Sequence, residues 1–102
     1  MIKELKPIYE NVKSYYKKAY ILETYAESIE LTTLKLYSYD THVATIQTRC
    51  NDYTMLKEFN VYVTHNPNHL TQTTLRHINE FLQQNGFTKQ SKKNLLSMYE
   101  NI

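Results

Sequence analysis

The chain has 102 residues, 41% of them hydrophobic, and its 12 basic and 10 acidic residues give a net charge of +2. This length predicts one domain over residues 1–102, and the charge is too balanced to indicate a strongly basic nucleic-acid-binding module or a densely acidic DNA mimic. The single glycine excludes the glycine-rich loops that hold phosphates, and the single cysteine, Cys50, excludes an internal disulfide.

The first predicted element is a helix over residues 7–26. Ile8, Val12 and Ala19 belong to a series of apolar residues at helical spacing. Pro7 suits the first turn of a helix, where a backbone N–H group has no partner within the helix. The helix is expected to carry a basic group made of Lys13, Lys17 and Lys18.

Three strands are predicted after this helix. In the first, Leu34 and Leu36 alternate with Lys35 and a tyrosine, as expected of a strand with one buried face. Ile29 and Leu31 stand at odd-numbered positions, whereas Leu34 and Leu36 stand at even-numbered ones, so the two pairs would face opposite sides of one regular strand. A bulge or a separate short strand is therefore expected near residues 32–33. The three strands are expected over residues 28–39, 43–48 and 58–64.

Two further helices are predicted beyond a loop around Pro67. The first is capped by a threonine between Thr71 and Thr74 and ends at Gly86, the residue type that most readily adopts the left-handed conformation after a helix. The second begins after Ser91, which is its expected cap, and runs to about residue 101.

The order α-β-β-β-α-α predicts a two-layer α+β domain with a three-stranded antiparallel sheet. One face of this sheet would be covered by the helix over residues 7–26 and by the helix around residues 75–82. The other face would carry tyrosines toward solvent. Tyrosine is a rigid amphipathic residue that is enriched at interfaces, and the chain has ten of them. The tyrosines expected on this face are Tyr37, Tyr39 and Tyr62.

No metal site and no cofactor are expected. His65 and His69 have the spacing of a metal-binding pair on a helix, but Pro67 between them places both in a loop. A zinc site needs at least three protein ligands, and Cys50 or Asp52 would supply the third only through a coincidence of the fold. The two histidines are therefore interpreted as exposed loop residues.

No catalytic group is expected either, so the protein is predicted not to be an enzyme. A lone cysteine such as Cys50 is usually a small buried hydrophobic residue. Asp40 and Asp52 both fall in loops of a chain too short for a large cleft. Glu80 lies four residues after Arg76 on a predicted helix, which favours a surface ion pair over an acid–base role.

Two features point to anionic partners. Arg76 and His77 lie near the start of a predicted helix, where backbone N–H groups attract anions, so a phosphate or a partner carboxylate is a candidate ligand there. The order αβββα also matches the double-stranded-RNA-binding fold. That module needs a basic cluster at the start of its second helix, and here Arg76 stands alone among threonines and a glutamine.

Two segments carry a resemblance to a known domain. The first has Ser38, Tyr39, Thr41, Val43 and Ala44 in the pattern Ser-Tyr-x-Thr-x-Val-Ala. The second has the pattern Thr-Thr-x-x-His-Ile-Asn-Glu-Phe-Leu and matches at Thr73, Thr74, His77, Ile78, Asn79, Glu80, Phe81 and Leu82. Over about residues 34–87 the chain resembles a small domain of unknown function found in bacteriophages and mobile elements. The resemblance implies phage origin and the cytoplasm of a host bacterium, and it implies no established activity.

Small phage proteins without a catalytic signature often bind and block host defence enzymes. The leading hypothesis is therefore a non-enzymatic anti-defence protein that inhibits a host nuclease, with a CRISPR nuclease such as Cas9 as the specific expectation. The alternative is a nucleic-acid-binding accessory protein, and a homodimer paired through residues 32–33 or 58–64 is a further possibility. No membrane partner is expected. The residues expected to bind the partner are Tyr37, Tyr39, Tyr62, Arg76, Lys13, Lys17 and Lys18.

Overall fold

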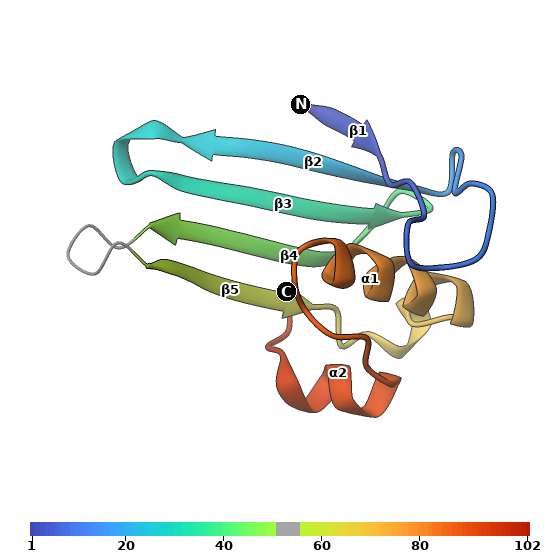
Figure 1. Ribbon diagram of the computed structural model, residues 1–102. Coiled ribbons are helices and arrows are strands. Elements are labelled where there is room, and N and C mark those ends of the chain that lie inside the picture. Colours follow the sequence, from blue (N-terminus) through green and yellow to red (C-terminus); the bar gives the residue numbers. More distant parts are fainter. Residues whose placement is uncertain (51–55) are drawn as a thin grey trace.

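The computed structural model describes residues 1–50 and 56–102, and its main feature is a five-stranded antiparallel sheet (Figure 1). Each strand pairs with its neighbours along the chain, so the spatial order is β1-β2-β3-β4-β5. The fold is α+β as expected, but the predicted three-stranded sheet is wrong. The strands are β1 Ile2–Glu4, β2 Ala19–Ala26, β3 Leu31–Ser38, β4 Thr41–Cys50 and β5 Lys57–Val63.

The predicted helix over residues 7–26 does not form. Its last eight residues are β2, which pairs with β3 along its whole length, from Ala19 opposite Ser38 to Ala26 opposite Leu31. The preceding segment, which we call the N-terminal loop (residues 5–18), is irregular. The apolar residues of β2 fit a helical spacing equally well over so short a stretch. Pairing decides the outcome, because β2 shares backbone hydrogen bonds with β3 along its whole length and with β1 over residues 20–22.

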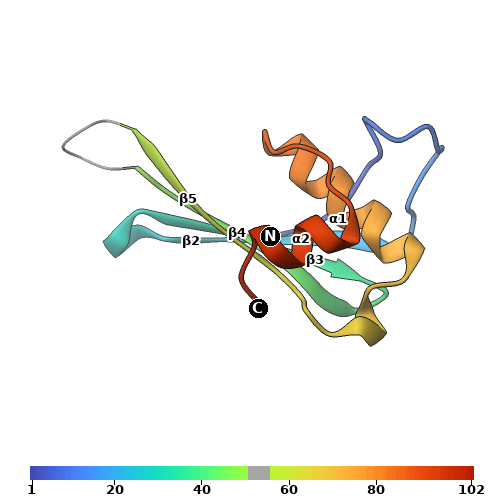
Figure 2. The same cartoon turned by 90° about the horizontal axis from the view of Figure 1, so that it is seen from below.

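Two α-helices, α1 (Gln72–Gln84) and α2 (Lys92–Met98), lie on the same side of the sheet (Figure 2). Short 3₁₀ helices, η1 (Glu27–Ile29) and η2 (Pro67–His69), stand before β3 and α1 respectively. The core lies between α1 and the sheet. Its fully buried residues include Leu36, Ala44, Ile46, Val63, Ile78, Phe81 and Leu82.

The turn between β3 and β4 contains two residues in the left-handed region, Tyr39 (φ 49°) and Asp40 (φ 66°). Two such residues define the tight hairpin turn whose twist matches that of the flanking strands. The Tyr39 N–H group also donates to the Lys18 carbonyl at 2.8 Å, which ties this turn to the N-terminal loop. A turn does separate the two strands expected over residues 28–39 and 43–48, but it is confined to Tyr39 and Asp40, because Thr41 and His42 already belong to β4.

A bulge does occur in the sheet, but not near residues 32–33, where it was expected. Leu36 lies opposite Ala44, whereas Tyr37 lies opposite His42, so Val43 is an extra residue on β4. The parity break that suggested a bulge has a different cause. Ile29 belongs to η1, outside both strands, and β3 begins only at Leu31.

Both ends of α1 follow the sequence prediction. The Thr71 side chain caps the helix by accepting a hydrogen bond from the Thr74 N–H group at 3.2 Å. Beyond the C-terminal end, Gly86 has φ +90°, which a residue with a Cβ atom rarely adopts. The shorter helix α2 is capped by Ser91, as predicted, but ends at Met98. In residues 1–50 and 56–102, neither helix has the length and apolar character needed to cross a membrane.

The outer edge of β5 is partly covered by the end of the chain. Glu100 pairs in parallel with Tyr62, and the Val63 N–H group donates to the Glu100 carbonyl at 2.9 Å. By contrast, β3 is the central strand, so residues 32–33 are already paired on both sides and the dimer expected through them is excluded. Pairing through residues 58–64 stays a prediction.

Candidate functional site

The sheet has one face that neither helix covers, which we call the open face. Tyr20, Tyr37 and His42 form a row across this face on β2, β3 and β4. The rings of Tyr20 and Tyr37 are stacked, with centroids 5.1 Å apart and planes 7° apart, and the rings of Tyr37 and His42 are 5.4 Å apart. The Tyr20 hydroxyl donates to Asp40 Oδ1 at 3.1 Å. The row is therefore held in place before any partner arrives.

His42 is neutral at the end of this row. Its Nε2 atom lies 3.1 Å from the Ala44 carbonyl oxygen and 2.5 Å from Thr45 Oγ1. A carbonyl only accepts, so Nε2 carries the hydrogen. Burial lowers the pKa of His42 below its ordinary value, and the ammonium group of Lys35 lowers that pKa further. The aromatic row therefore carries no charge of its own at neutral pH.

The same face continues onto β5. Tyr62 lies opposite Thr45, which in turn lies opposite Lys35, so the three side chains share the open face. Tyr62 and Lys35 are half-buried. Aromatic residues among polar ones are the composition that distinguishes interface centres from the rest of a protein surface. Polar side chains at the margins of the open face are Thr24, Thr33, Gln47, Arg49 and Asn60.

The structure divides the predicted binding residues between two sides of the molecule. Tyr37 and Tyr62 lie on the open face, as expected. Tyr39 lies in the turn between β3 and β4, and its ring centroid is 5.9 Å from that of His77 on α1. Arg76 is also on α1, on the helix side of the sheet. The remaining three, Lys13, Lys17 and Lys18, are exposed in the N-terminal loop.

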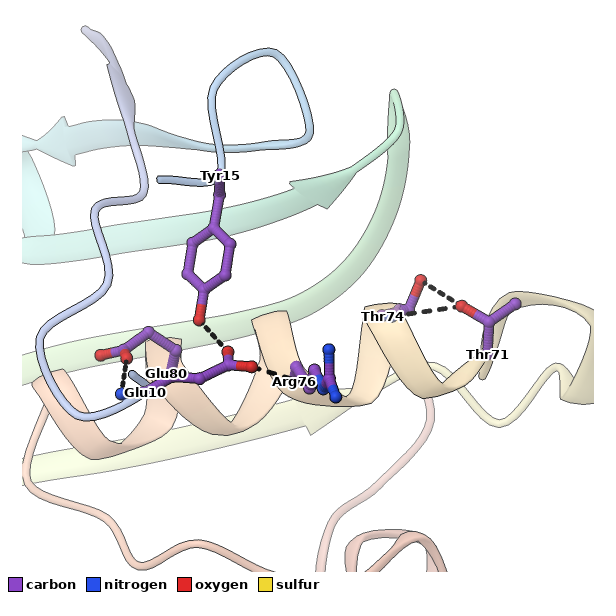
Figure 3. Close-up of polar contacts among 6 residues, drawn as sticks. All are labelled: Glu10, Tyr15, Thr71, Thr74, Arg76 and Glu80. Atoms are coloured by element: carbon purple, nitrogen blue, oxygen red, sulfur yellow. Dashed lines mark hydrogen bonds and ion pairs between the residues drawn. The ribbon is translucent and has the colours of Figure 1, made fainter. Parts of the chain in front are cut away.

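Arg76 contacts the N-terminal loop rather than its own helix (Figure 3). Its Nε atom lies 3.3 Å from Glu10 Oε1, while the Tyr15 hydroxyl donates to the other oxygen of Glu10. Burial raises the pKa of Tyr15 above its ordinary value, and the hydrogen bond to Glu10 and the charge of that carboxylate raise it further. Tyr15 therefore remains protonated and continues to donate.

The expected ion pair between Glu80 and Arg76 is wrong. Glu80 is only 1% exposed, and its Oε1 atom accepts from the backbone N–H groups of Tyr9 at 3.0 Å and Glu10 at 2.9 Å (Figure 3). Its Oε2 atom accepts from Gln84 Nε2 at 2.7 Å. Charge-assisted hydrogen bonds to several donors are what allow a carboxylate to be buried. Glu80 thus holds the N-terminal loop against α1.

A chain of hydroxyl groups links β3 to α1 in the core. Thr71 Oγ1 donates to Thr74 Oγ1, which lies 3.1 Å from Ser38 Oγ, and Ser38 Oγ lies 2.8 Å from His77 Nδ1. Burial lowers the pKa of His77 below its ordinary value. Ser38 and His77 are 2% and 1% exposed, so substrate cannot reach them as a nucleophile and base. We assign the pair a structural role.

Asn79 has a similar role. Its side chain donates from Nδ2 to the Gln90 carbonyl and accepts at Oδ1 from the Gln90 N–H group, both at 2.9 Å. This paired contact fixes the segment between α1 and α2. Together with Ser38, Thr74, His77 and Glu80, Asn79 belongs to the buried polar residues of the two sequence motifs. The motifs therefore describe how the fold is held together.

The candidate metal and thiol residues do not converge. His65 Nε2 lies 2.9 Å from the Tyr99 carbonyl, and His69 Nδ1 lies 3.3 Å from Thr64 Oγ1. No group of three metal-binding side chains occurs among residues 1–50 and 56–102. Cys50 is half-buried at the end of β4, and Asp52 lies outside the described residues.

Sequence reasoning missed Tyr20 because it placed this residue on a helix. Residues 19–22 also alternate, with Ala19 and Ile21 buried and Tyr20 and Leu22 half-buried. The sequence Ala-Tyr-Ile-Leu is apolar or aromatic throughout, so this alternation of burial has no counterpart in an apolar–polar pattern of the sequence. Only the pairing of β2 with β3 places Tyr20 beside Tyr37.

The fold is a small α+β domain with a meandering sheet, one face of which neither helix covers. The chain belongs to a family of unknown function, DUF8033, whose model matches residues 3–97. The match confirms the expectation of an uncharacterised domain and extends it well beyond residues 34–87, into the N-terminal loop and α2. No curated protein and no solved structure matches the chain.

Proposed function

We propose that the protein acts by binding another macromolecule through the open face, without catalysing a reaction. The observation that carries this proposal is the row formed by Tyr20, Tyr37 and His42 on the uncovered side of the sheet. Ordered aromatic side chains lose little conformational entropy on binding, which is why they dominate interface energetics. The histidine–serine pair and the buried carboxylate serve the fold, which supports a binding role over an enzymatic one.

The partner that we put first is a host defence enzyme, in particular a CRISPR nuclease such as Cas9, met in the bacterial cytoplasm. This choice rests on the resemblance of the two motifs to a domain of bacteriophages and mobile elements. Under this proposal, the protein is an anti-defence inhibitor of phage origin that binds its target stoichiometrically. Half-buried Lys35 lies at the centre of the open face. A charged contact at this lysine would fix how the two surfaces align in such a complex.

The test is a pull-down of the tagged protein with a Cas9 nuclease, with and without guide RNA, followed by a DNA cleavage assay. Thr33→Arg places bulk and charge on the open face without removing a core contact, and Tyr37→Ala removes the centre of the row. Both substitutions should abolish capture and restore cleavage. Tyr16→Ala is the matched control, because Tyr16 is 65% exposed in the N-terminal loop. Capture by all variants alike would show that the open face is not the binding surface.

Nucleic-acid binding is the second candidate function. It is favoured by lysines on the helix side that have no acidic partner in the described part of the chain. Binding through phosphates weakens steeply as salt rises, whereas a complex through the open face responds little. Retention of a nucleic acid at low salt and its release at moderate salt would favour this second function. The lysines concerned are Lys13, Lys17, Lys18, Lys89, Lys92 and Lys93.

A further inference from the structure

A groove runs along the outer side of α1, away from the open face. It has a volume of about 480 Å³, and its floor is a stripe of α1 that extends from Gln72 through Leu75 to Gln83. The twelve helical residues from Gln72 to Gln83 rise by about 16 Å, which is the length of roughly five residues of extended peptide. The N-terminal loop forms one wall at Tyr9, and the segment before α2 forms the other.

The accessible charge of this groove is positive. Lys89 and Lys92 line it and have no acidic partner among the described residues. Arg76 is 62% exposed and uses its Nε atom for Glu10, so its two terminal nitrogens are left to face a ligand. The ion pair with Glu10 fixes the plane of the guanidinium group. A fixed guanidinium with two free nitrogens is suited to binding a carboxylate through two parallel hydrogen bonds.

We infer that this groove binds an acidic, extended segment of a protein, with one carboxylate on Arg76 and others on Lys89 and Lys92. Leu75 and Tyr9 offer apolar contacts to the intervening side chains, and the amides of Gln72 and Gln83 match the donors and acceptors of a peptide backbone. The carboxylates of Glu10 and Glu80 on the same lining disfavour a nucleic-acid backbone with a phosphate at every residue. This site is separate from the open face and does not rest on the proposed function.

The probe is a fluorescent ten-residue peptide of alternating glutamate and alanine, capped at both ends, with an oligothymidylate of the same length as comparison. Binding is followed by anisotropy and by amide chemical shifts of the ¹⁵N-labelled protein. We expect shifts along residues 72–83 and 89–92. Arg76→Gln should weaken peptide binding about tenfold, the usual effect of losing one charge-assisted contact. The double change Lys89→Gln with Lys92→Gln removes two such contacts and should weaken binding by more than this.

Three controls make the outcome decisive. Lys57→Gln removes an exposed charge from β5, outside the groove, and should leave the affinity unchanged. Arg76→Lys keeps the charge but loses the second hydrogen bond, so its affinity should fall between those of the wild type and Arg76→Gln. Thr33→Arg should bind the peptide normally, because it alters only the open face. Absence of peptide binding, equal binding by the groove variants, or tighter binding of the oligothymidylate would each overturn the inference.

Discussion

Glu80 Oε1 lies 2.9 Å from the backbone nitrogen of Glu10, although the two residues are 70 positions apart in the chain. The two glutamates have different roles. Glu80 is buried and binds backbone N–H groups of the N-terminal loop, whereas Glu10 presents its carboxylate to Tyr15 and Arg76. The groove along α1 therefore depends on a carboxylate that is itself buried in its lining.

Removing this carboxylate should destabilise the fold. In Glu80→Ala, the N–H groups of Tyr9 and Glu10 lose their acceptor, and the free energy of unfolding should fall by about 2–4 kcal/mol. Glu80→Gln keeps one acceptor oxygen and should cost about half as much. Urea denaturation followed by circular dichroism measures both. Glu27→Gln, in the exposed η1 turn, is the control and should not move the midpoint. An unchanged midpoint for Glu80→Ala would contradict the assigned role.

The stability should fall between pH 7.5 and pH 5.5. Because burial lowers the pKa of His77, the unfolded chain binds a proton below its ordinary pKa of about 6.5 while the folded protein does not. Protonation of this histidine therefore stabilises the unfolded state by up to about 1.4 kcal/mol at pH 5.5, and the free energy of unfolding falls accordingly. Urea midpoints across this range measure the effect, and His77→Asn should reduce the slope. His42, whose pKa burial also lowers, contributes to the remaining slope. A slope that is identical in His77→Asn would exclude this explanation.

The segment between the two helices should become mobile without Asn79. Asn79→Ala removes two hydrogen bonds to Gln90 and leaves its N–H group without a partner, which should cost about 2 kcal/mol. Amide hydrogen exchange should accelerate at Gln90 and over α2 more than in β3 or β4. Gln83→Ala, on the exposed side of the same helix, provides the comparison. Uniform acceleration over the whole sheet would instead indicate a global loss of stability.

Gly86 should tolerate only residues that accept a left-handed backbone. Its φ of +90° strains any residue with a Cβ atom, although no atom lies within 4 Å of the position that this Cβ would take. Gly86→Ala should therefore lower the free energy of unfolding by about 1 kcal/mol through backbone strain alone. Gly86→Asn should cost less, because asparagine adopts this region more readily. Thermal unfolding of the two variants distinguishes strain from a steric clash, which would penalise the larger asparagine more.

Local signals predicted the second half of the chain well. Thr71 and Gly86 mark the ends of α1, and Ser91 marks the start of α2. Each of these features depends on a few neighbouring residues, so it is visible in the sequence. The inward-facing position of His77 follows from the apolar stripe of the same helix.

Features that depend on distant residues were predicted wrongly. Residues 19–26 became a strand because β3 and β1 lie on either side of them, and no local pattern reports that pairing. Glu80 lies one turn from Arg76, which suggested an ion pair, but the backbone of Glu10 provides stronger donors in a buried setting.

The order of the strands also bears on how the protein is made. Each strand of the sheet pairs with the one synthesised just before it, so the sheet can grow one hairpin at a time as the chain leaves the ribosome. The N-terminal loop emerges first but has no acceptor for its Tyr9 and Glu10 N–H groups until α1 has been completed. The N-terminal loop therefore stays undocked, and open to proteases and chaperones, until α1 has formed.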